Sequence, residues 1–270
     1  MEPGVKVNVK PDAKAFNWVG KRTGEGNMHI TSEEENKAVD YDLNFIKPWK
    51  SKAKVRFELK EQDGKTAVSW SMDSKLPFFM FWMKKMMVAF ISMDYDRGLR
   101  LLKDYTEDGK VHSKLNFIGN EKHQGFKYVG VKTSCTIDSM GKKMAESLPE
   151  VMGYLTENQL EATGKPFTQY HKWDMVNNKV DYVTGIPVAE IPSSLPSKFH
   201  GGEIPESKIY TLEHKGPYPH LGNAWSTLYT MQRGKEFKLN KKIHPFETYH
   251  NHPGEVNEKE LITQIHFPVV

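Results

Sequence analysis

Two short stretches of the chain place polar groups among aromatic side chains. Residues 244–250 read His-Pro-Phe-Glu-Thr-Tyr-His, and residues 165–171 read Lys-Pro-Phe-Thr-Gln-Tyr-His. Side chains alternate between the two faces of a strand, so Glu247 and Tyr249 are expected on one face, with Tyr170 at the place equivalent to Tyr249. A carboxylate beside aromatic rings favours a desolvated cation. The sequence therefore predicts a ligand site centred on Glu247.

Further aromatic residues are candidates to line this site. Phe246 flanks the glutamate, Trp173 stands in a polar segment expected to be a loop, and Trp225 lies on an expected helix. Tyr128 begins an expected strand. Both Trp225 and Tyr128 have a structural alternative, because large aromatic side chains are most often core residues. The predicted ligand-binding residues are Glu247, Tyr249, Tyr170, Phe246, Trp173, Trp225 and Tyr128.

The two stretches are parts of an internal repeat with an offset of roughly 80 residues. The first copy has expected strands at 126–132 and 180–188, and the second has them at 207–213 and 261–269. Between these strands, apolar residues recur at helical spacing. Two strand-helix-strand-strand units related by a pseudo-twofold axis are expected to form a curved sheet, with helices on one side and a cleft on the other.

In this repeat, Thr168 takes the place of Glu247, so the expected cleft carries its negative charge on one side only. Such a cleft favours ligands that are polar at one end. The alternative for Glu247 is a surface strand glutamate paired with a neighbouring lysine, an interaction that contributes little to stability.

This order of elements, with Gly216-Pro-Tyr-Pro-His-Leu221 opening the second helix, resembles the GyrI-like (gyrase-inhibitor-like, AraC-type effector-binding) domain of drug-sensing transcription factors. The resemblance spans about residues 111–270. It implies a central cleft that binds diverse small molecules, often cationic or aromatic, and it assigns the cleft glutamate to Glu247.

Two functions fit this resemblance. The first is a small-molecule-binding protein without a DNA-binding domain, which captures a hydrophobic, cationic or aromatic compound. The second is a hydrolase that detoxifies strained-ring electrophiles, with Glu247 as general base. The sequence does not distinguish these two functions, because a glutamate that binds a ligand and a glutamate that activates water have the same sequence pattern. No catalytic residue other than Glu247 is expected.

The N-terminal part has a different pattern. Apolar and polar residues alternate between Val5 and Asp73, as in successive antiparallel strands, and Gln62-Asp63-Gly64-Lys65 predicts a hairpin turn. After Pro77 the period becomes helical up to about Tyr105, and Gly109 ends the expected helix. The predicted fold class is therefore α+β, with a boundary between domains at 1–109 and 110–270.

A sheet followed by one long helix resembles the START-like, polyketide-cyclase-like (SRPBCC) helix-grip family over about residues 1–108. Family members begin with a strand and two short helices that this chain does not contain. Two expectations follow. Either the start of the sequence is truncated, or the open side of the sheet is covered by the other domain, by a second copy in a homodimer, or by a protein partner. The resemblance also implies a third function, a carrier of lipid or polyketide-like ligands. Its motifs are residues 24–31, 45–49, 66–72 and 96–103.

The apolar segment Leu76–Met93 is interrupted by Lys84 and Lys85, whereas a membrane span needs about 18 residues with few charges. An amphipathic helix packed on the sheet is expected, with peripheral membrane contact as the alternative. A single cysteine, Cys135, excludes an internal disulfide, and a cytoplasmic location is expected.

Composition and motifs predict neither a metal, a cofactor nor nucleic acid as a partner. The formal charge is only +4, and the basic run Lys47–Arg56 is expected to form a solvated strand face. The histidines at 244, 250 and 252 lack cysteine partners and a His-Glu-x-x-His helix. Gly24 and Gly26 lack the third glycine of a dinucleotide-binding loop.

Overall fold

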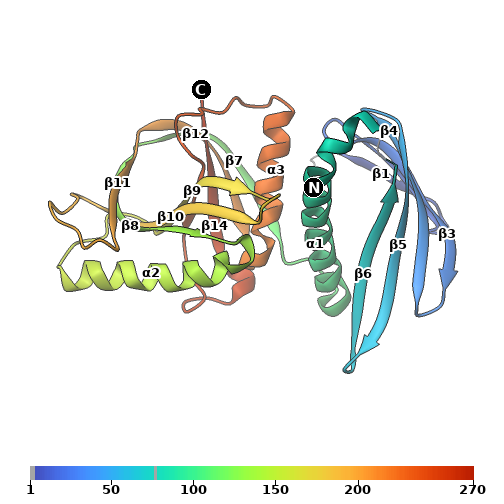
Figure 1. The fold of residues 1–270 in the computed structure, drawn as a ribbon, viewed down its shortest axis with the longest axis horizontal. Helices are drawn as coiled ribbons and strands as arrows, with labels where there is room; N and C mark the ends of the chain where they lie inside the picture. The colour runs from blue at the N-terminus through green and yellow to red at the C-terminus, as the bar shows by residue number, and fades with distance from the viewer. Residues whose placement is uncertain (1–3, 76–77) are drawn as a thin grey trace. The chain divides into compact units, whose positions relative to one another are not determined.

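The computed structural model describes residues 4–75 and 78–270, and contacts divide the chain into two compact units, residues 1–100 and 101–270 (Figure 1). Leu76 and Pro77, where the sequence predicts the start of the helical segment, lie outside the described residues. The fold is α+β with antiparallel sheets, as expected.

The first unit is a six-stranded antiparallel meander in which each strand pairs with the next. The predicted hairpin is confirmed, because Gln62 pairs with Lys65 and both Asp63 and Gly64 have positive φ, as a two-residue turn of this type requires. The sequence pattern missed the second strand. The strands are β1 (Lys6–Val9), β2 (Ala15–Gly20), β3 (Gly24–Glu34), β4 (Ala38–Lys47), β5 (Ser51–Gln62) and β6 (Lys65–Ser74).

Helical structure follows as the 3-10 helix η1 (Phe78–Met83) and the long helix α1 (Lys84–Asp108). Tyr95 of α1 stacks on Trp70 of β6 with ring centroids 4.0 Å apart. Gly109 has a φ of 69° directly after the helix, which is the left-handed conformation expected of a glycine at a helix end.

The second unit contains an eight-stranded antiparallel sheet in the order β11-β8-β10-β9-β13-β14-β12-β7. Its chain order confirms the predicted repeat, since β8-α2-β9-β10 and β12-α3-β13-β14 are both strand, helix, strand, strand. The bounds are β7 (Lys114–His123), β8 (Phe126–Cys135), η2 (Ile137–Ser139), α2 (Met140–Glu157), β9 (Phe167–Asp174), β10 (Lys179–Val188), β11 (His200–Ile204), β12 (Ser207–Lys215), η3 (Tyr218–His220), α3 (Leu221–Arg233), β13 (Phe246–Tyr249), η4 (Glu258–Glu260) and β14 (Ile262–Val269).

The pseudo-twofold axis passes between β9 and β13 at the middle of this sheet. There Glu247 pairs directly with Thr168, its counterpart in the repeat, which is the register that a twofold relation demands. The edge strands exchange between the copies: β7 pairs with β12 of the second copy, and β11 pairs with β8 of the first. Each copy therefore completes the sheet of the other.

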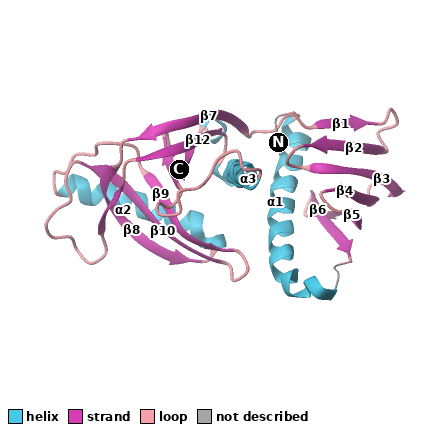
Figure 2. Cartoon of the chain, turned by 90° about the horizontal axis from the view of Figure 1, so that it is seen from above, coloured by secondary structure: helices cyan, strands magenta, loops and turns pink. Residues whose placement is uncertain are grey.

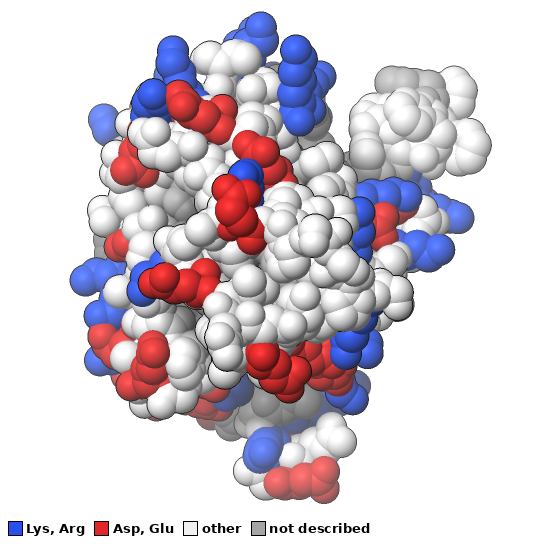
Figure 3. Space-filling view, turned by 90° about the vertical axis from the view of Figure 1, so that its left-hand side faces the viewer, with Lys and Arg blue, Asp and Glu red and all other residues white. Residues whose placement is uncertain are grey.

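Both helices of the second unit lie on the same face of its sheet. Helix α2 packs on β8 and β10 through Val151 and Leu155, and α3 packs on β12 and β14 through Leu228 and Met231 (Figures 1 and 2). The opposite face carries a separate buried cluster that includes Phe167 and Phe246. On the surface shown in Figure 3, where the second unit faces the viewer, acidic and basic side chains are interspersed.

None of the helices within residues 4–75 and 78–270 is long and apolar enough to cross a membrane.

Candidate ligand-binding site

The centre of the second sheet holds a buried carboxylate. Glu247 lies on β13, between Thr168 of β9 and Ile265 of β14, and its exposed fraction is 2%. Within the part of the chain that the structure describes, no basic side chain lies in ion-pair contact with it. The alternative expectation of a surface glutamate paired with a lysine is therefore wrong.

Three uncharged donors hold the carboxylate. The Trp225 indole N–H of α3 donates to Oε1, and the hydroxyls of Tyr249 and Tyr170 donate to Oε2 at 2.9 Å and 3.2 Å. The two tyrosines occupy equivalent positions in the two copies of the repeat, so the pseudo-twofold axis aims both hydroxyls at one oxygen. The carboxylate is thus fixed in orientation by donors that bring no positive charge.

A line of hydroxyls continues from Tyr249 across β9 and β10. The Tyr249 hydroxyl lies 2.9 Å from Thr168 Oγ1, which is 3.2 Å from Thr184 Oγ1. Because a phenol has one proton, donation to Glu247 leaves the Thr168 hydroxyl to donate to Tyr249. Thr168, which occupies the position equivalent to Glu247 in the first copy of the repeat, therefore supports Glu247 through Tyr249.

Burial governs the titration of this group. Burial raises the pKa of Glu247 above its ordinary value, and the hydrogen bonds from Trp225, Tyr249 and Tyr170 oppose that rise. Burial, followed by the charge of Glu247, raises the pKa of Tyr170 and of Tyr249 well above 10, so both hydroxyls stay protonated as donors. Tyr218 of η3 responds in the same way: burial and then Glu247 raise the pKa of its phenol.

Aromatic rings lead from the carboxylate to the surface. Tyr170 meets Trp225 edge-on at 5.1 Å and Trp173 at 5.6 Å, and Trp225 stacks with Tyr229 at 6.1 Å. Trp173 and Tyr229 are 39% and 42% exposed, whereas Tyr170 and Trp225 are half-buried. The rings of Tyr170 and Trp225 therefore separate the buried carboxylate of Glu247 from the exposed Trp173 and Tyr229.

The structure brings five of the predicted residues together. Glu247, Tyr249, Tyr170 and Trp225 are in hydrogen-bond contact, and Trp173 borders them at the surface. Trp173 lies on β9 and not in a loop, because the strand continues to Asp174.

Two predicted residues belong elsewhere. Phe246 points to the opposite face of β13, since neighbours along a strand alternate, and it packs with Tyr128 in the buried cluster there. The expectation that the site lies on the face without helices is also wrong: Trp225 of α3 contacts Glu247, so the carboxylate lies on the helical face. The repeat pattern fixes which residues share a face, but not which face the helices cover.

Sequence reasoning missed two contributors. Tyr218 packs edge-on against Tyr249 at 5.9 Å, and Thr184 ends the line of hydroxyls. Tyr218 lies within the Gly216–Leu221 motif, which predicts the start of a helix but does not by itself predict a contact with Tyr249. No local signal marks Thr184, because only the pairing of β10 with β9 brings it to Thr168.

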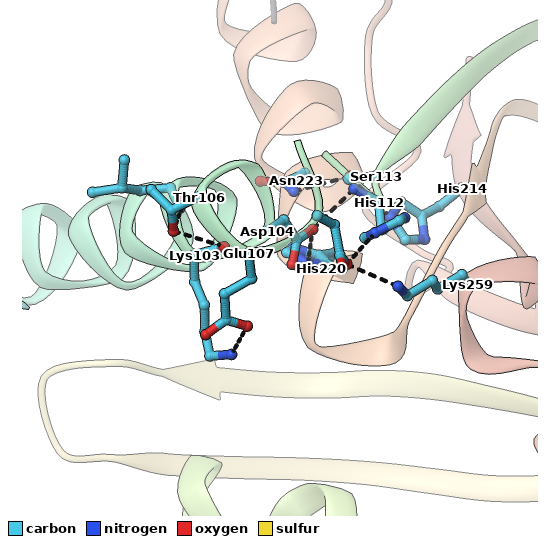
Figure 4. Close-up of polar contacts among 12 residues, drawn as sticks. Lys103, Asp104, Thr106, Glu107, His112, Ser113, His214, His220, Asn223 and Lys259 are labelled. Atoms are coloured by element: carbon cyan, nitrogen blue, oxygen red, sulfur yellow. Dashed lines mark hydrogen bonds and ion pairs between the residues drawn. The ribbon is translucent and has the colours of Figure 1, made fainter. Parts of the chain in front are cut away.

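A second polar cluster joins the end of α1 to the start of α3 (Figure 4). Asp104 Oδ2 accepts the backbone N–H of His112 at 2.9 Å and lies 3.0 Å from Nε2 of His220, which is 5% exposed. Asp108 Oδ2 accepts from His112 Nε2 at 2.6 Å and from Lys259 Nζ at 2.8 Å. These contacts attach the last turns of α1 to the second unit.

The same cluster contains a serine and a histidine in contact. Ser113 Oγ lies 3.1 Å from His214 Nε2 and accepts from Asn223 Nδ2 at 3.0 Å. A Ser–His nucleophile needs a third group to orient its imidazole, and His214 Nδ1 has no hydrogen-bond partner among the described residues. We therefore assign this pair a structural role. Residues 4–75 and 78–270 also contain no group of three or more His, Cys, Asp or Glu side chains arranged to hold a metal.

A repeated strand-helix-strand-strand fold, with one buried carboxylate among aromatic rings on its axis, defines a small-molecule-binding domain. The GyrI-like small molecule binding domain family matches residues 121–270, and the chain belongs to this family. The match does not extend to the first unit, so the helix-grip resemblance stays a prediction.

Solved structures share the fold. EcmrR, in a cryo-EM complex with DNA, is 18% identical over 70% of this chain and 69% of its own, with a TM-score of 0.50. Weaker similarity joins the chain to SAV2435 bound to tetraphenylphosphonium (14% identity, 58% and 94% coverage, TM-score 0.43) and to a hydrolase from Listeria innocua (12%, 58% and 91%, 0.38). No curated protein matches the chain.

Proposed function

We propose that the second unit binds a hydrophobic organic cation, with Glu247 as the counter-charge. The observation that carries this proposal is the buried carboxylate, which three uncharged donors hold and which no basic side chain of the described residues neutralises. A buried carboxylate without a counter-ion is costly, because desolvation is not offset by an opposite charge. A bound cation would supply that charge.

The rings around the carboxylate set the class of ligand. The faces of Trp225, Tyr170 and Trp173 offer cation–π contacts, which are strongest for weakly hydrated, delocalised cations. A small ammonium or a metal ion would keep its water and gain little from these rings. Lipophilic aromatic cations therefore fit the site best.

Calorimetric titration of the whole chain with tetraphenylphosphonium tests the proposal. Tetraphenylborate, which has the same shape and the opposite charge, is the matched control ligand. We expect binding of the cation only, and we expect Glu247→Gln to weaken it by about 30-fold or more, because a buried charge pair is lost. Glu157→Gln, an exposed substitution on α2, should leave the affinity unchanged. Equal binding of both ions, or unchanged affinity in Glu247→Gln, would refute the proposal.

Hydrolysis is the second candidate, and one observation favours it. Burial raises the pKa of Glu247 above its ordinary value, which is the direction that suits a general base. Both carboxylate oxygens, however, already accept hydrogen bonds, which ties up the lone pairs that a base needs. Mass spectrometry of strained-ring electrophiles incubated with the protein distinguishes the two: a hydrolysed product that Glu247→Gln abolishes would identify an enzyme.

A further inference from the structure

One end of the first unit gathers three chain segments. Gly20 pairs with Gly24, Phe45 with Ser51, and Ala53 with Ser74, so the β2–β3 turn, the β4–β5 turn and the residues after β6 share this end. In Figure 1 the arrowhead of β6 and the start of the helical segment lie there together. We call it the aromatic end, defined by residues 20–25, 45–52, 74–75 and 78–85.

The aromatic end exposes an unusual amount of apolar surface. Phe78, Phe81 and Trp82 of η1 are 87%, 74% and 70% exposed, and Trp49 of the β4–β5 turn is 71% exposed. Phe45 and Ile46 beside Trp49 are exposed as well. Soluble proteins rarely leave several large apolar side chains together in water, and such a patch marks an interaction surface.

Basic residues surround this patch. Within the described residues, none of the nearby lysines at 50, 52, 75, 84 and 85 forms an ion pair, and all five are exposed. The one local carboxylate in an ion pair, Glu25, already binds Lys47 at 2.9 Å. The patch is thus apolar at its centre and positively charged at its border.

The other end of the same sheet differs. Its turns carry Glu33, Glu34, Glu61 and Asp63 among lysines, and ion pairs such as Lys14–Glu33 form there. The net positive charge of the aromatic end is therefore a local feature of the unit and not a property of its whole surface.

We propose that the aromatic end docks on the surface of an anionic lipid bilayer. Tryptophan and phenylalanine partition into the headgroup region, where the ring is desolvated, and the surrounding lysines are attracted to anionic headgroups. The mode is peripheral, since none of the described helices can span a bilayer. Residues of η1 would enter the interface, with Lys84 and Lys85 at headgroup level.

Two other occupants fit less well. Duplex nucleic acid, whose bases are already stacked, would pair the lysines with phosphates but leave the aliphatic Ile46 and the exposed rings of η1 in water. A second copy of this chain would bring its own lysines to the same patch if it bound in a twofold manner, because such an interface pairs each surface with itself.

Vesicle co-sedimentation of the whole chain tests the proposal. We expect binding to vesicles of phosphatidylcholine mixed with phosphatidylserine and none to phosphatidylcholine alone, with affinity falling as salt increases. Phe81→Ser/Trp82→Ser should lose at least about tenfold in affinity. Lys84→Gln/Lys85→Gln should lose roughly 30-fold, because each lysine near an anionic surface contributes about fivefold.

Matched controls separate the patch from general effects. Tyr105→Ser removes an aromatic ring that is exposed elsewhere, and Lys60→Gln/Lys65→Gln removes two lysines from the other end of the sheet; both should bind like the unaltered chain. Melting temperatures check that each variant folds. Absent binding to anionic vesicles, equal loss in the controls, or aromatic-end variants that abolish only a dimer or a DNA gel shift would each overturn the proposal.

Discussion

At the scale of single residues, the second sheet buries both acidic and basic titratable groups. Burial raises the pKa of Glu247, while burial and then the charge of His220 lower the pKa of His214 to about 4. Burial also lowers the pKa of His266 to about 3; both of its ring nitrogens meet threonine hydroxyls, Thr211 at 3.0 Å and Thr248 at 2.9 Å. The fold thus holds both histidines neutral.

Neutral buried histidines make stability depend on pH. An unfolded histidine binds a proton near pH 6.5, whereas folded His214 does so only near pH 4, so the unfolded chain binds more protons between these values. Stability is fully present above pH 6.5 and is lost as the pH falls toward 4. Each such histidine contributes about 1.4 kcal/mol per pH unit in this window.

We expect His214→Gln to reduce the slope of unfolding free energy against pH by about 1.4 kcal/mol per unit between pH 6 and 5, measured by urea unfolding. The variant also loses its bond to Ser113, which lowers stability at every pH but leaves the slope test intact. His252→Gln, which removes an exposed imidazole, is the control. An unchanged slope in His214→Gln would show that His214 is not held neutral.

The sequence predicted the centre of the site and not its surroundings. Glu247, Tyr249 and Tyr170 followed from the repeat and from strand alternation, because both are local patterns that the twofold pairing preserves. Phe246 was assigned to the site although alternation places it on the other face of β13. Thr184 and Tyr218 reach the site only through long-range packing, which no local pattern encodes.

At the scale of elements, two of the strands that the sequence missed, β7 and β11, depend on pairing with strands far away in the chain. β11 contains Gly201 and Gly202, which weaken any strand pattern, and it forms because β8 of the other copy offers a free edge. β7 pairs with β12 more than 80 residues away, so the exchange of edge strands is invisible in sequence. The turn at Asp63-Gly64 was found because two residues specify it locally.

Helix α1 approaches the first sheet closely at one glycine. A Cβ on Gly98 would lie 2.6 Å from Cζ3 of Trp70, whose ring is itself fixed between Phe57 and Tyr95. A Cβ on Gly153 of α2 would meet nothing within 4 Å. The two helical glycines therefore differ in their surroundings while sharing the same intrinsic cost in a helix.

We expect Gly98→Ala to destabilise the first unit, because the clash with Trp70 outweighs the gain of about 1 kcal/mol in helix propensity. Gly153→Ala should raise stability by up to that amount. Thermal unfolding monitored by tryptophan fluorescence and by circular dichroism measures both. Equal stabilisation in the two variants would mean that α1 does not pack on Trp70 as closely as the structure has it.

At the scale of the whole molecule, the boundary between the units lies inside a helix. The helix-ending Gly109 suggested a boundary between 109 and 110, whereas the contacts divide the chain between Arg100 and Leu101. The last turns of α1 join the second unit because Asp104 meets His220 and Asp108 meets Lys259 (Figure 4). A continuous helix hides this division, since its sequence period does not change where its packing partners do.

Two shortened chains, starting at residue 101 and at residue 110, test this division. Starting at 110 leaves buried His220 without Asp104, which should cost about 2 kcal/mol, and so lower the melting temperature by roughly 4 to 8 °C for a unit of this size. In the chain from 101, Asp104→Asn should reproduce part of that loss. Glu107→Gln, which removes an exposed pair with Lys103, should not. If both chains melt at the same temperature, residues 101–109 contribute nothing to the second unit, and the boundary lies at the glycine.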